Sequence, residues 1–191
     1  LHKDSEGGIW AGTYFGGINY FPKQHFSFQK YFPDYTENSI TGNAVREICE
    51  DRFGNIWIGT EDAGINKLNP KTKQVTHFEP TGESTSIANS NIHGLLAVKD
   101  DLWIGTFEHG LDIMDIRTGK VKKHYQSGPG QNDLKSNFIL SLLLTKSGDI
   151  YLASSNGLFK YNSEGDDFVR QQAVPQNAFV ACLVEHQEGT I

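Results

Sequence analysis

The fold of this 191-residue chain is decided by one stretch, Gly54-Asn55-Ile56-Trp57-Ile58-Gly59-Thr60, which is followed by Ala63-Gly64-Ile65-Asn66. The apolar, β-prone run Ile56–Ile58 predicts a strand. We expect Gly59 to end that strand, where a bulky side chain would obstruct the following turn. Ile65 then begins a second strand, so the stretch predicts a strand, a tight turn and a strand.

The stretch recurs along the chain at a nearly constant period. Its aromatic residue appears as Trp10, Trp57, Trp103 and Tyr151, at spacings of 47, 46 and 48 residues. Each copy is followed by glycine and an aliphatic residue at the start of the next predicted strand. Self-similarity at such a period indicates an array of one supersecondary unit.

The second copy gives the clearest picture of the unit. Four β-prone segments separated by turn-forming residues are named A to D in order, and they cover residues 45–50, 56–60, 65–68 and 75–78. The third copy places them near residues 92–98, 102–106, 111–114 and 121–125, and the fourth near residues 139–144, 150–153, 158–161 and 168–171. Four strands joined by tight turns predict one antiparallel meander per unit.

The two ends of the chain lie out of phase with this unit. Residues 1–8 supply only an A–B turn, so the first unit is expected to contain strands B to D without A. Residues 179–185 read as a strand A of a further unit. The predicted partition is therefore 1–43, 44–90, 91–137, 138–177 and 178–191.

The loops between strands D and A share a pattern of their own. Ser39-Ile40, Ser86-Ile87 and Asp133-Leu134 follow one another at an offset of 47 residues, each three residues before an Asn or Ser. We expect the aliphatic residue to act as a plug that tucks the loop onto the core. The Asn or Ser suits a hydrogen bond from its side chain to the backbone.

Four-stranded meanders that repeat at 40–50 residues are the signature of a β-propeller. Such a sheet, or blade, has two apolar faces, and stacking around an axis buries both. A strand-B tryptophan has the size to fill the space between neighbours. Helical solenoids are excluded because no segment has a sustained helical period. The coils of a parallel β-helix are shorter than this unit. The predicted fold class is thus all-β, a propeller fragment of about four blades.

Composition excludes several other classes of protein. The net charge is −6 without a basic cluster, so nucleic acid is not an expected partner. No apolar run is long enough to cross a membrane, and residues 1–20 contain no signal peptide. Because the first residue is Leu, we expect a fragment whose targeting and membrane segments lie elsewhere. Cys49 and Cys182 have no metal-binding spacing and are expected to be buried thiols, with a disulfide as the alternative.

The pattern Asp51-x-x-Gly54-Asn55-Ile56-Trp57-Ile58-Gly59-Thr60-x-x-x-Gly64-Ile65-Asn66-Lys67-Leu68-Asn69 resembles the two-component regulator propeller repeat. The third unit matches it over residues 102–115 and the first over residues 8–20. The fourth unit is degenerate, with Tyr151 in place of Trp and Ala153-Ser154 in place of Gly-Thr. The resemblance covers nearly the whole chain.

This resemblance implies a location and a role. Such repeats build propellers of about seven blades in the periplasmic sensor region of hybrid two-component systems, which are common in gut Bacteroidetes. A β-sandwich, a transmembrane helix and a cytoplasmic histidine kinase follow there, and many of these sensors respond to oligosaccharides. The chain is then expected to contribute ligand sensing rather than catalysis. Its expected partners are an oligosaccharide, the remaining blades of its parent protein and, through propeller surfaces, a second copy.

In a propeller the B–C and D–A loops share one face. The predicted B–C loops carry Tyr14-Phe15, Glu61-Asp62, Phe107-Glu108-His109 and Ser155-Asn156, and Arg46 and His93 lie near the top of strands A. Rings beside carboxylates and amides suit sugars, whose C–H faces stack on aromatics while their hydroxyls form hydrogen bonds. The predicted ligand site comprises Tyr14, Phe15, Arg46, Glu61, Asp62, Phe107, Glu108 and His109. The alternative is that Tyr14, Phe15 and Phe107 cover the contact between blades.

Two other functional classes stay open at this point. Glu61, Asp62 and Glu108 are the carboxylates that a propeller lyase or glycoside hydrolase would need. No catalytic motif, metal-ligand spacing or cofactor-binding loop accompanies them. Asp4 and Asp51 lie in A–B turns, where capping of the turn is the expected role. A protein-interaction scaffold is the third reading, and an apolar loop face would favour it.

Overall fold

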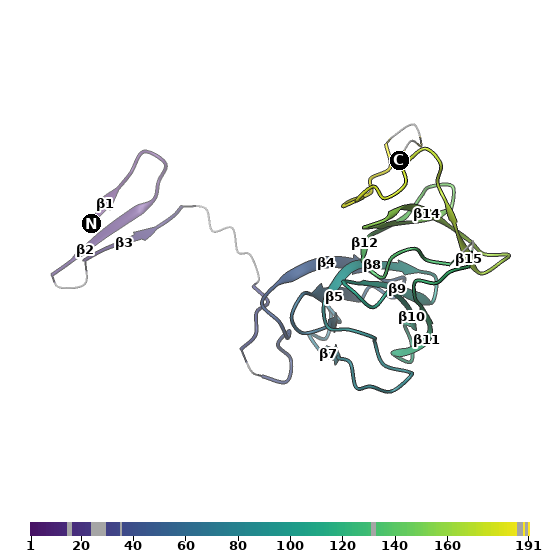
Figure 1. Ribbon diagram of the computed structural model, residues 1–191. Helices are drawn as coiled ribbons and strands as arrows, with labels where there is room; N and C mark the ends of the chain where they lie inside the picture. Colours follow the sequence, from purple (N-terminus) through teal and green to yellow (C-terminus); the bar gives the residue numbers. More distant parts are fainter. Residues whose placement is uncertain (15–16, 24–29, 35, 131–132, 187–188, 190) are drawn as a thin grey trace. The chain divides into compact units, whose positions relative to one another are not determined.

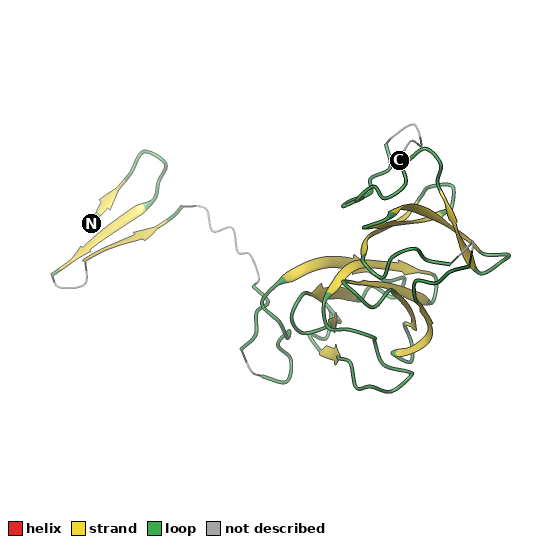
Figure 2. Cartoon of the chain, in the orientation of Figure 1, coloured by secondary structure: helices red, strands yellow, loops and turns green. Residues whose placement is uncertain are grey.

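The computed structural model describes the chain except for residues 15–16, 24–29, 35, 131–132, 187–188 and 190. The described residues form strands, turns and loops and no helix (Figure 2). The chain divides into two units, Leu1–Tyr31 and Phe32–Ile191. The prediction of an all-β fold is confirmed.

The first unit is a three-stranded antiparallel sheet of β1 (His2–Lys3), β2 (Ile9–Thr13) and β3 (Gly17–Phe21). The prediction that residues 1–8 form only a turn is wrong, because His2 and Lys3 pair with Trp10 and Ile9. Asp4 Oδ1 accepts the backbone N–H of Gly8 at 2.7 Å, which closes the turn tightly enough to bring β1 onto β2. The fourth strand expected for this blade cannot be compared, since residues 24–29 lie outside the described part of the chain.

The second unit contains three four-stranded antiparallel sheets, each with its strands in chain order. Blade 2 comprises β4 (Val45–Glu50), β5 (Ile56–Thr60), β6 (Ile65–Leu68) and β7 (Val75–Phe78). Blade 3 comprises β8 (Ile92–Val98), β9 (Asp101–Thr106), β10 (Leu111–Asp115) and β11 (Lys120–Tyr125). Blade 4 comprises β12 (Ile139–Leu144), β13 (Ile150–Ser154), β14 (Gly157–Asn162) and β15 (Asp167–Arg170). The first strand of blade 3, β8, contacts both β4 and β12, so the inner strands of the three blades meet (Figure 1).

Tryptophans of the second strands fill the space between consecutive blades, as predicted. Trp57 of blade 2 is fully buried in a cluster whose other members come mainly from blade 3. Trp103 of blade 3 occupies the corresponding place in a cluster with residues of blade 4. The repeat period of the sequence therefore produces one apolar layer per pair of blades, which is the packing of a β-propeller.

The repeated glycine has a different role from the one expected. Gly59 lies inside β5, so it does not end the strand. A Cβ atom at Gly59 would lie 2.8 Å from Ile92 Cγ2, and one at Gly105 would lie 2.6 Å from Ile139 Cγ2. The glycine therefore makes room for the first strand of the next blade. In blade 2 the turn instead relies on Gly64, whose φ of 74° favours glycine.

The aliphatic plugs of the D–A loops are confirmed. Ile40, Ile87 and Leu134 are 4%, 2% and 1% exposed. A polar side chain at the second residue of strand β6 or β10 fastens the loop that carries the plug. Asn66 Oδ1 accepts the backbone N–H of Thr41 at 2.7 Å, and Asp112 Oδ2 accepts that of Ala88 at 2.7 Å.

The A–B turn of blade 2 is closed by Asp51, as predicted. Asp51 Oδ1 accepts the backbone N–H groups of Phe53 and Asn55 at 2.9 and 3.0 Å. Its second oxygen, Oδ2, accepts Trp57 Nε1–H at 2.8 Å. Burial raises the pKa of Asp51, but the hydrogen bonds from Asn55 and Trp57 lower it by more than burial raises it. The net pKa of Asp51 therefore lies below the ordinary value. The same carboxylate thus holds both the turn and the interblade tryptophan.

Two expectations for the C-terminal segment are wrong. Residues 179–185 do not form a strand. In each four-stranded sheet the first strand pairs only with the second, and no described strand follows residue 185 to serve as that partner. Cys182 lies on this segment and is exposed rather than buried, whereas Cys49 on β4 is half-buried. Both thiols are free, and burial raises the pKa of Cys49 to about 12.

Candidate functional site

In the second unit, the loops between the second and third strands of each blade, together with the loops between these blades, form what we call the loop face. On this face five side chains from blades 2 to 4 lie in a chain of contacts that we call the Arg46 cluster: Arg46, Glu61, His93, Phe107 and Phe138. Arg46 Nη1 lies 2.9 Å from Glu61 Oε1, which in turn lies 3.7 Å from His93 Nε2.

The aromatic half of the cluster continues from His93. Its ring centroid lies 4.8 Å from that of Phe107, which meets Phe138 edge to face at 4.8 Å. The backbone of Phe107 is fixed at two points. Its N–H donates to Asn91 O at 3.1 Å, and Phe107 forms an antiparallel β-bridge with Phe138. Phe107 therefore covers a contact between blades and also contacts His93, the neighbour of the charged pair.

His93 is the buried centre of the cluster. Only 8% of the residue is exposed, and its Nδ1 has no hydrogen-bond partner in the described part of the chain. Burial lowers the pKa of His93, Arg46 lowers it further and Glu61 opposes the change, so its net pKa lies below the ordinary value. A neutral imidazole with an unused nitrogen can therefore accept or donate a hydrogen bond in the cluster.

Three other predicted site residues have different surroundings. Asp62 accepts the backbone N–H groups of Asn43 and Ala44 at 2.9 and 3.4 Å, and its pKa lies below the ordinary value chiefly because of the bond from Asn43. His109 Nδ1 lies 2.9 Å from Asn89 Nδ2. Asp62 and His109 thus hold loop backbone or a loop side chain, while Glu108 is exposed.

The remaining two predicted residues belong to the first unit. Tyr14 is 95% exposed. Phe15 lies outside the described residues. Of the eight predicted residues, the structure links Arg46, Glu61 and Phe107 through His93, which the sequence singled out only as a neighbour.

The Arg46 cluster borders a groove between the inner strands. This central groove has a volume of about 820 Å³ and is lined by parts of β4, β8 and β12 and by Ala181–Leu183. Arg46 and Glu61 line it, as do Cys49 and Cys182. The lining combines the Arg46–Glu61 ion pair with aliphatic side chains of the inner strands, so the groove has both polar and apolar surface.

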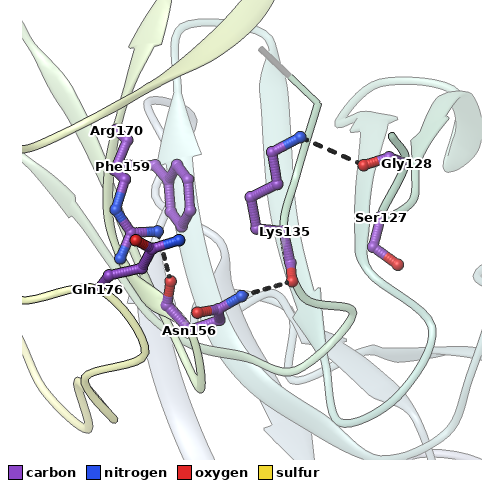
Figure 3. Close-up of a pocket in the computed structure, with 7 residues that line it drawn as sticks. All are labelled: Ser127, Gly128, Lys135, Asn156, Phe159, Arg170 and Gln176. Atoms are coloured by element: carbon purple, nitrogen blue, oxygen red, sulfur yellow. Dashed lines mark hydrogen bonds between the residues drawn. The ribbon is translucent and has the colours of Figure 1, made fainter. Parts of the chain in front are cut away.

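A second cavity, called the Lys135 cavity, lies between blades 3 and 4 and has a volume of about 400 Å³. It is lined by seven residues from loops and from strands β14 and β15: Ser127, Gly128, Lys135, Asn156, Phe159, Arg170 and Gln176. In Figure 3, Arg170, Asn156 and Gln176 lie on one side, and Ser127 and Gly128 lie on the other. Of these residues, only Asn156 was predicted on the ligand-binding face, as part of a B–C loop.

The geometry does not favour acid–base catalysis at the predicted carboxylates. Glu61 forms an ion pair with Arg46, and Asp62 accepts two backbone N–H groups. A general acid needs a carboxyl group that holds a proton near neutral pH, whereas the backbone N–H groups that Asp62 accepts lower its pKa below the ordinary value. Within the described residues, no group of three or more His, Cys, Asp or Glu side chains is placed to hold a metal ion.

Repeated antiparallel sheets with a tryptophan between consecutive blades define a protein of the β-propeller class. Within that class, the family model described as "Two component regulator propeller" matches residues 39–62. The resemblance seen in the sequence is therefore confirmed over these residues.

Proteins similar to this chain include a histidine kinase and the extracellular domains of putative hybrid two component systems. The chain is 30% identical over 169 residues to histidine kinase P4 of Formosa agariphila, a match that covers 86% of this chain and 12% of that protein. The extracellular domain of a putative hybrid two component system from B. thetaiotaomicron superposes with a TM-score of 0.63 at 21% identity, covering 91% of this chain and 24% of that one. A second such domain from the same organism gives a TM-score of 0.50 at 20% identity, over 92% and 29% of the two chains. The chain thus spans about an eighth of the curated relative and about a quarter of these structures.

The described residues contain no helix of the length and apolar character needed to span a membrane.

Proposed function

We propose that this chain is a ligand-sensing, extracytoplasmic segment of a hybrid two-component signalling protein, located in the periplasm and responsive to oligosaccharides. The repeat family supports the signalling context, and the structurally similar proteins are extracellular domains. Histidine kinase activity, the remaining propeller blades and pairing with a second copy belong to the parent protein in this proposal.

The observation that carries the proposal is the Arg46 cluster beside the central groove. Sugars present both C–H faces and hydroxyl groups, so a sugar site combines aromatic rings with hydrogen-bonding groups. Phe107 and Phe138 supply the rings, while Arg46 and Glu61 supply donors and acceptors. The free Nδ1 of His93 adds one more polar group.

The cluster also explains how binding can be transmitted. Arg46 and Glu61 belong to blade 2, His93 and Phe107 to blade 3, and Phe138 adjoins the first strand of blade 4. A ligand that contacts all of them binds only when the three blades are packed together. Binding then stabilises the packed state by mass action, by about 2.7 kcal/mol at a ligand concentration of 100 Kd.

A thermal-shift screen of the chain against plant and host oligosaccharides tests the proposal. We expect one class of oligosaccharide to raise Tm, and we expect Arg46→Gln and Phe107→Leu to reduce the shift. Lys71→Gln, in the β6–β7 turn on the opposite face, is the control and should retain the full shift. The proposal is wrong if no oligosaccharide raises Tm. If both cluster variants retain the full shift in Tm, the ligand does not bind at the Arg46 cluster.

A further inference from the structure

The three blades of the second unit use two structurally equivalent positions differently. Asn66 pairs with His77 across β6 and β7, Asp112 pairs with His124 across β10 and β11, and Phe159 pairs with Arg170 across β14 and β15. Blades 2 and 3 thus carry an amide or carboxylate opposite a histidine, whereas blade 4 carries an aromatic ring opposite a guanidinium.

In blades 2 and 3 these pairs fasten the preceding D–A loop. Asn66 and Asp112 accept backbone N–H groups of the loop, as described above. The histidines complete the attachment, since His77 Nε2 lies 2.9 Å from Ser39 O and His124 Nε2 lies 3.0 Å from Ser84 O. A ring at the position of Phe159 offers no such acceptor to Lys135, the loop residue equivalent to Thr41 and Ala88.

Blade 4 replaces this attachment with the Lys135 cavity. Asn156 Nδ2 donates to Lys135 O at 3.0 Å, so in blade 4 the loop is held by a side chain of the β13–β14 loop and not by one of the third strand. The Arg170 guanidinium lies over the Phe159 ring, with its carbon 5.6 Å from the ring centroid. The cavity of about 400 Å³ occurs at this changed position and lies within the range of small-ligand sites.

Within the described residues, neither cation of the cavity has a carboxylate partner. Lys135 Nζ donates to the backbone oxygens of Gly128 and Gly130, and Arg170 donates to Asn156 O and Pro175 O at 3.0 and 3.3 Å. Among the ion pairs of the described residues, none includes Lys135 or Arg170. A lysine ammonium has three donors and an arginine guanidinium has five, so both retain donors for a ligand.

An amide oxygen in the cavity wall is also unsatisfied. Asn156 Oδ1 is buried and has no hydrogen-bond partner in the described part of the chain. A buried acceptor without a partner is costly, and a hydroxyl group that enters the cavity can supply the missing donor. The cavity therefore offers two cations for an anionic group and one acceptor for a hydroxyl.

We propose that the Lys135 cavity binds the acidic group of a charged saccharide, either a carboxylate or a sulfate ester, through Arg170 and Lys135. The inference rests on the proposed function, because it names the chemical class of the oligosaccharide that is sensed. Charge-assisted hydrogen bonds to Arg and Lys favour an acid group over a neutral one. A neighbouring hydroxyl of the same sugar donates to Asn156 Oδ1.

Calorimetric titration of the unmodified chain tests the inference with pairs of ligands that carry or lack the free acid group. Trigalacturonate is compared with its methyl ester, and a sulfated carrageenan tetrasaccharide with its desulfated counterpart. We expect at least one acid to bind about tenfold more tightly than its neutral form. Its affinity should fall as salt is added, because ions screen charge interactions.

Variants then locate the binding. Arg170→Gln and Lys135→Gln should each weaken binding of the preferred acid about tenfold, and Arg170→Lys should weaken it less. Lys120→Gln removes the same charge at the first residue of β11, next to a turn on the opposite face, and should leave the affinity unchanged. Far-ultraviolet circular dichroism and Tm show whether each variant is folded.

Each other result overturns the inference. Equal affinities for acid and ester, or unchanged affinity in the folded Arg170→Gln and Lys135→Gln variants, would exclude an acid site in this cavity. Binding of neutral oligosaccharides alone would have the same meaning and would leave the proposed sensing function in place. If neither neutral nor charged oligosaccharides bind, both the inference and the proposed function are wrong.

Discussion

His124 Nδ1 lies 2.6 Å from Asp112 Oδ1, and this contact fastens the loop between β7 and β8 to blade 3. Asp112 is completely buried and binds the backbone N–H of Ala88 with its other oxygen at 2.7 Å. His124 reaches Ser84 O with its second nitrogen at 3.0 Å. Two side chains on neighbouring strands thus hold the loop at two points.

This contact predicts a loss of stability at alkaline pH. Burial lowers the pKa of His124, but the hydrogen bonds to Asp112 and Ser84 and the charge of Asp112 raise it more, so its net pKa lies above 6.5. The folded state then binds the proton more tightly than the unfolded state. The stabilisation is complete below pH 6.5 and is lost as the pH rises through the pKa of the folded state. Urea unfolding from about pH 6 to about pH 9 measures this loss.

Asp112→Asn isolates the charge in this prediction. Asn66 occupies the equivalent position in blade 2 and accepts the equivalent backbone N–H, so an amide fits there. We expect Asp112→Asn to keep the loop attached but to remove the alkaline loss of stability. An unchanged pH profile in this variant would show that the charge of Asp112 does not cause the alkaline loss of stability.

Asp51→Ala should destabilise the protein by about 2–3 kcal/mol, because it leaves the buried Trp57 Nε1–H without an acceptor and also opens the turn. Asp51→Asn retains one acceptor oxygen and should cost less. Asp34→Ala is a matched control, since Asp34 caps an exposed turn through Thr36 but binds no indole. Urea unfolding measures all three variants. Equal losses in Asp51→Ala and Asp34→Ala would show that the indole bond contributes nothing.

The repeat period made much of this fold predictable. Alternating β-prone segments located the four strands of blade 2, and the recurring tryptophan indicated the apolar layer between blades. The aliphatic plugs were also visible, because Ile40, Ile87 and Leu134 recur at a constant offset. Features that every blade repeats can be read from one chain because each copy supports the others.

Features that depend on one blade's particular contacts were harder to predict. Residues 179–185 have strand-like composition, but a strand forms only with a partner to pair with. The Lys135 cavity depends on Phe159 and Arg170 at positions where blades 2 and 3 carry Asn66–His77 and Asp112–His124. An alignment of the units shows that these two residues differ in blade 4. Only the strand register shows that the two changed residues are paired with each other.

Gly105→Ala should cost about 1–3 kcal/mol by forcing blades 3 and 4 apart. Its Cβ would lie 2.6 Å from Ile139 Cγ2, and Ile139 is fully buried, so neither side chain has room to move. Ile139→Leu removes the branch that causes the clash. The double variant Gly105→Ala with Ile139→Leu should therefore lose less than the sum of the single losses in chemical unfolding. Strict additivity would show that the glycine is not required by Ile139.

His93 predicts a loss of stability in acid, opposite in sign to that of His124. Burial first, and then the Arg46 charge, lower the pKa of His93 below 6.5, while Glu61 at 3.7 Å only partly opposes them. The unfolded state therefore binds the proton more tightly than the folded state. The stabilisation is complete above pH 6.5 and is lost as the pH falls from 6.5 through the pKa of the folded state.

The repeat itself supplies the variant that tests this last prediction. Leu140 lies at the position of blade 4 that His93 occupies in blade 3 and is 4% exposed, so His93→Leu introduces a side chain that the repeat already accommodates. This variant should lose the acid-dependent part of its unfolding free energy between about pH 5 and about pH 7. His109→Gln, at an exposed histidine of the same face, should keep it. If His93→Leu instead retains the full acid-dependent loss, another group titrates in that range and His93 does not cause this loss of stability.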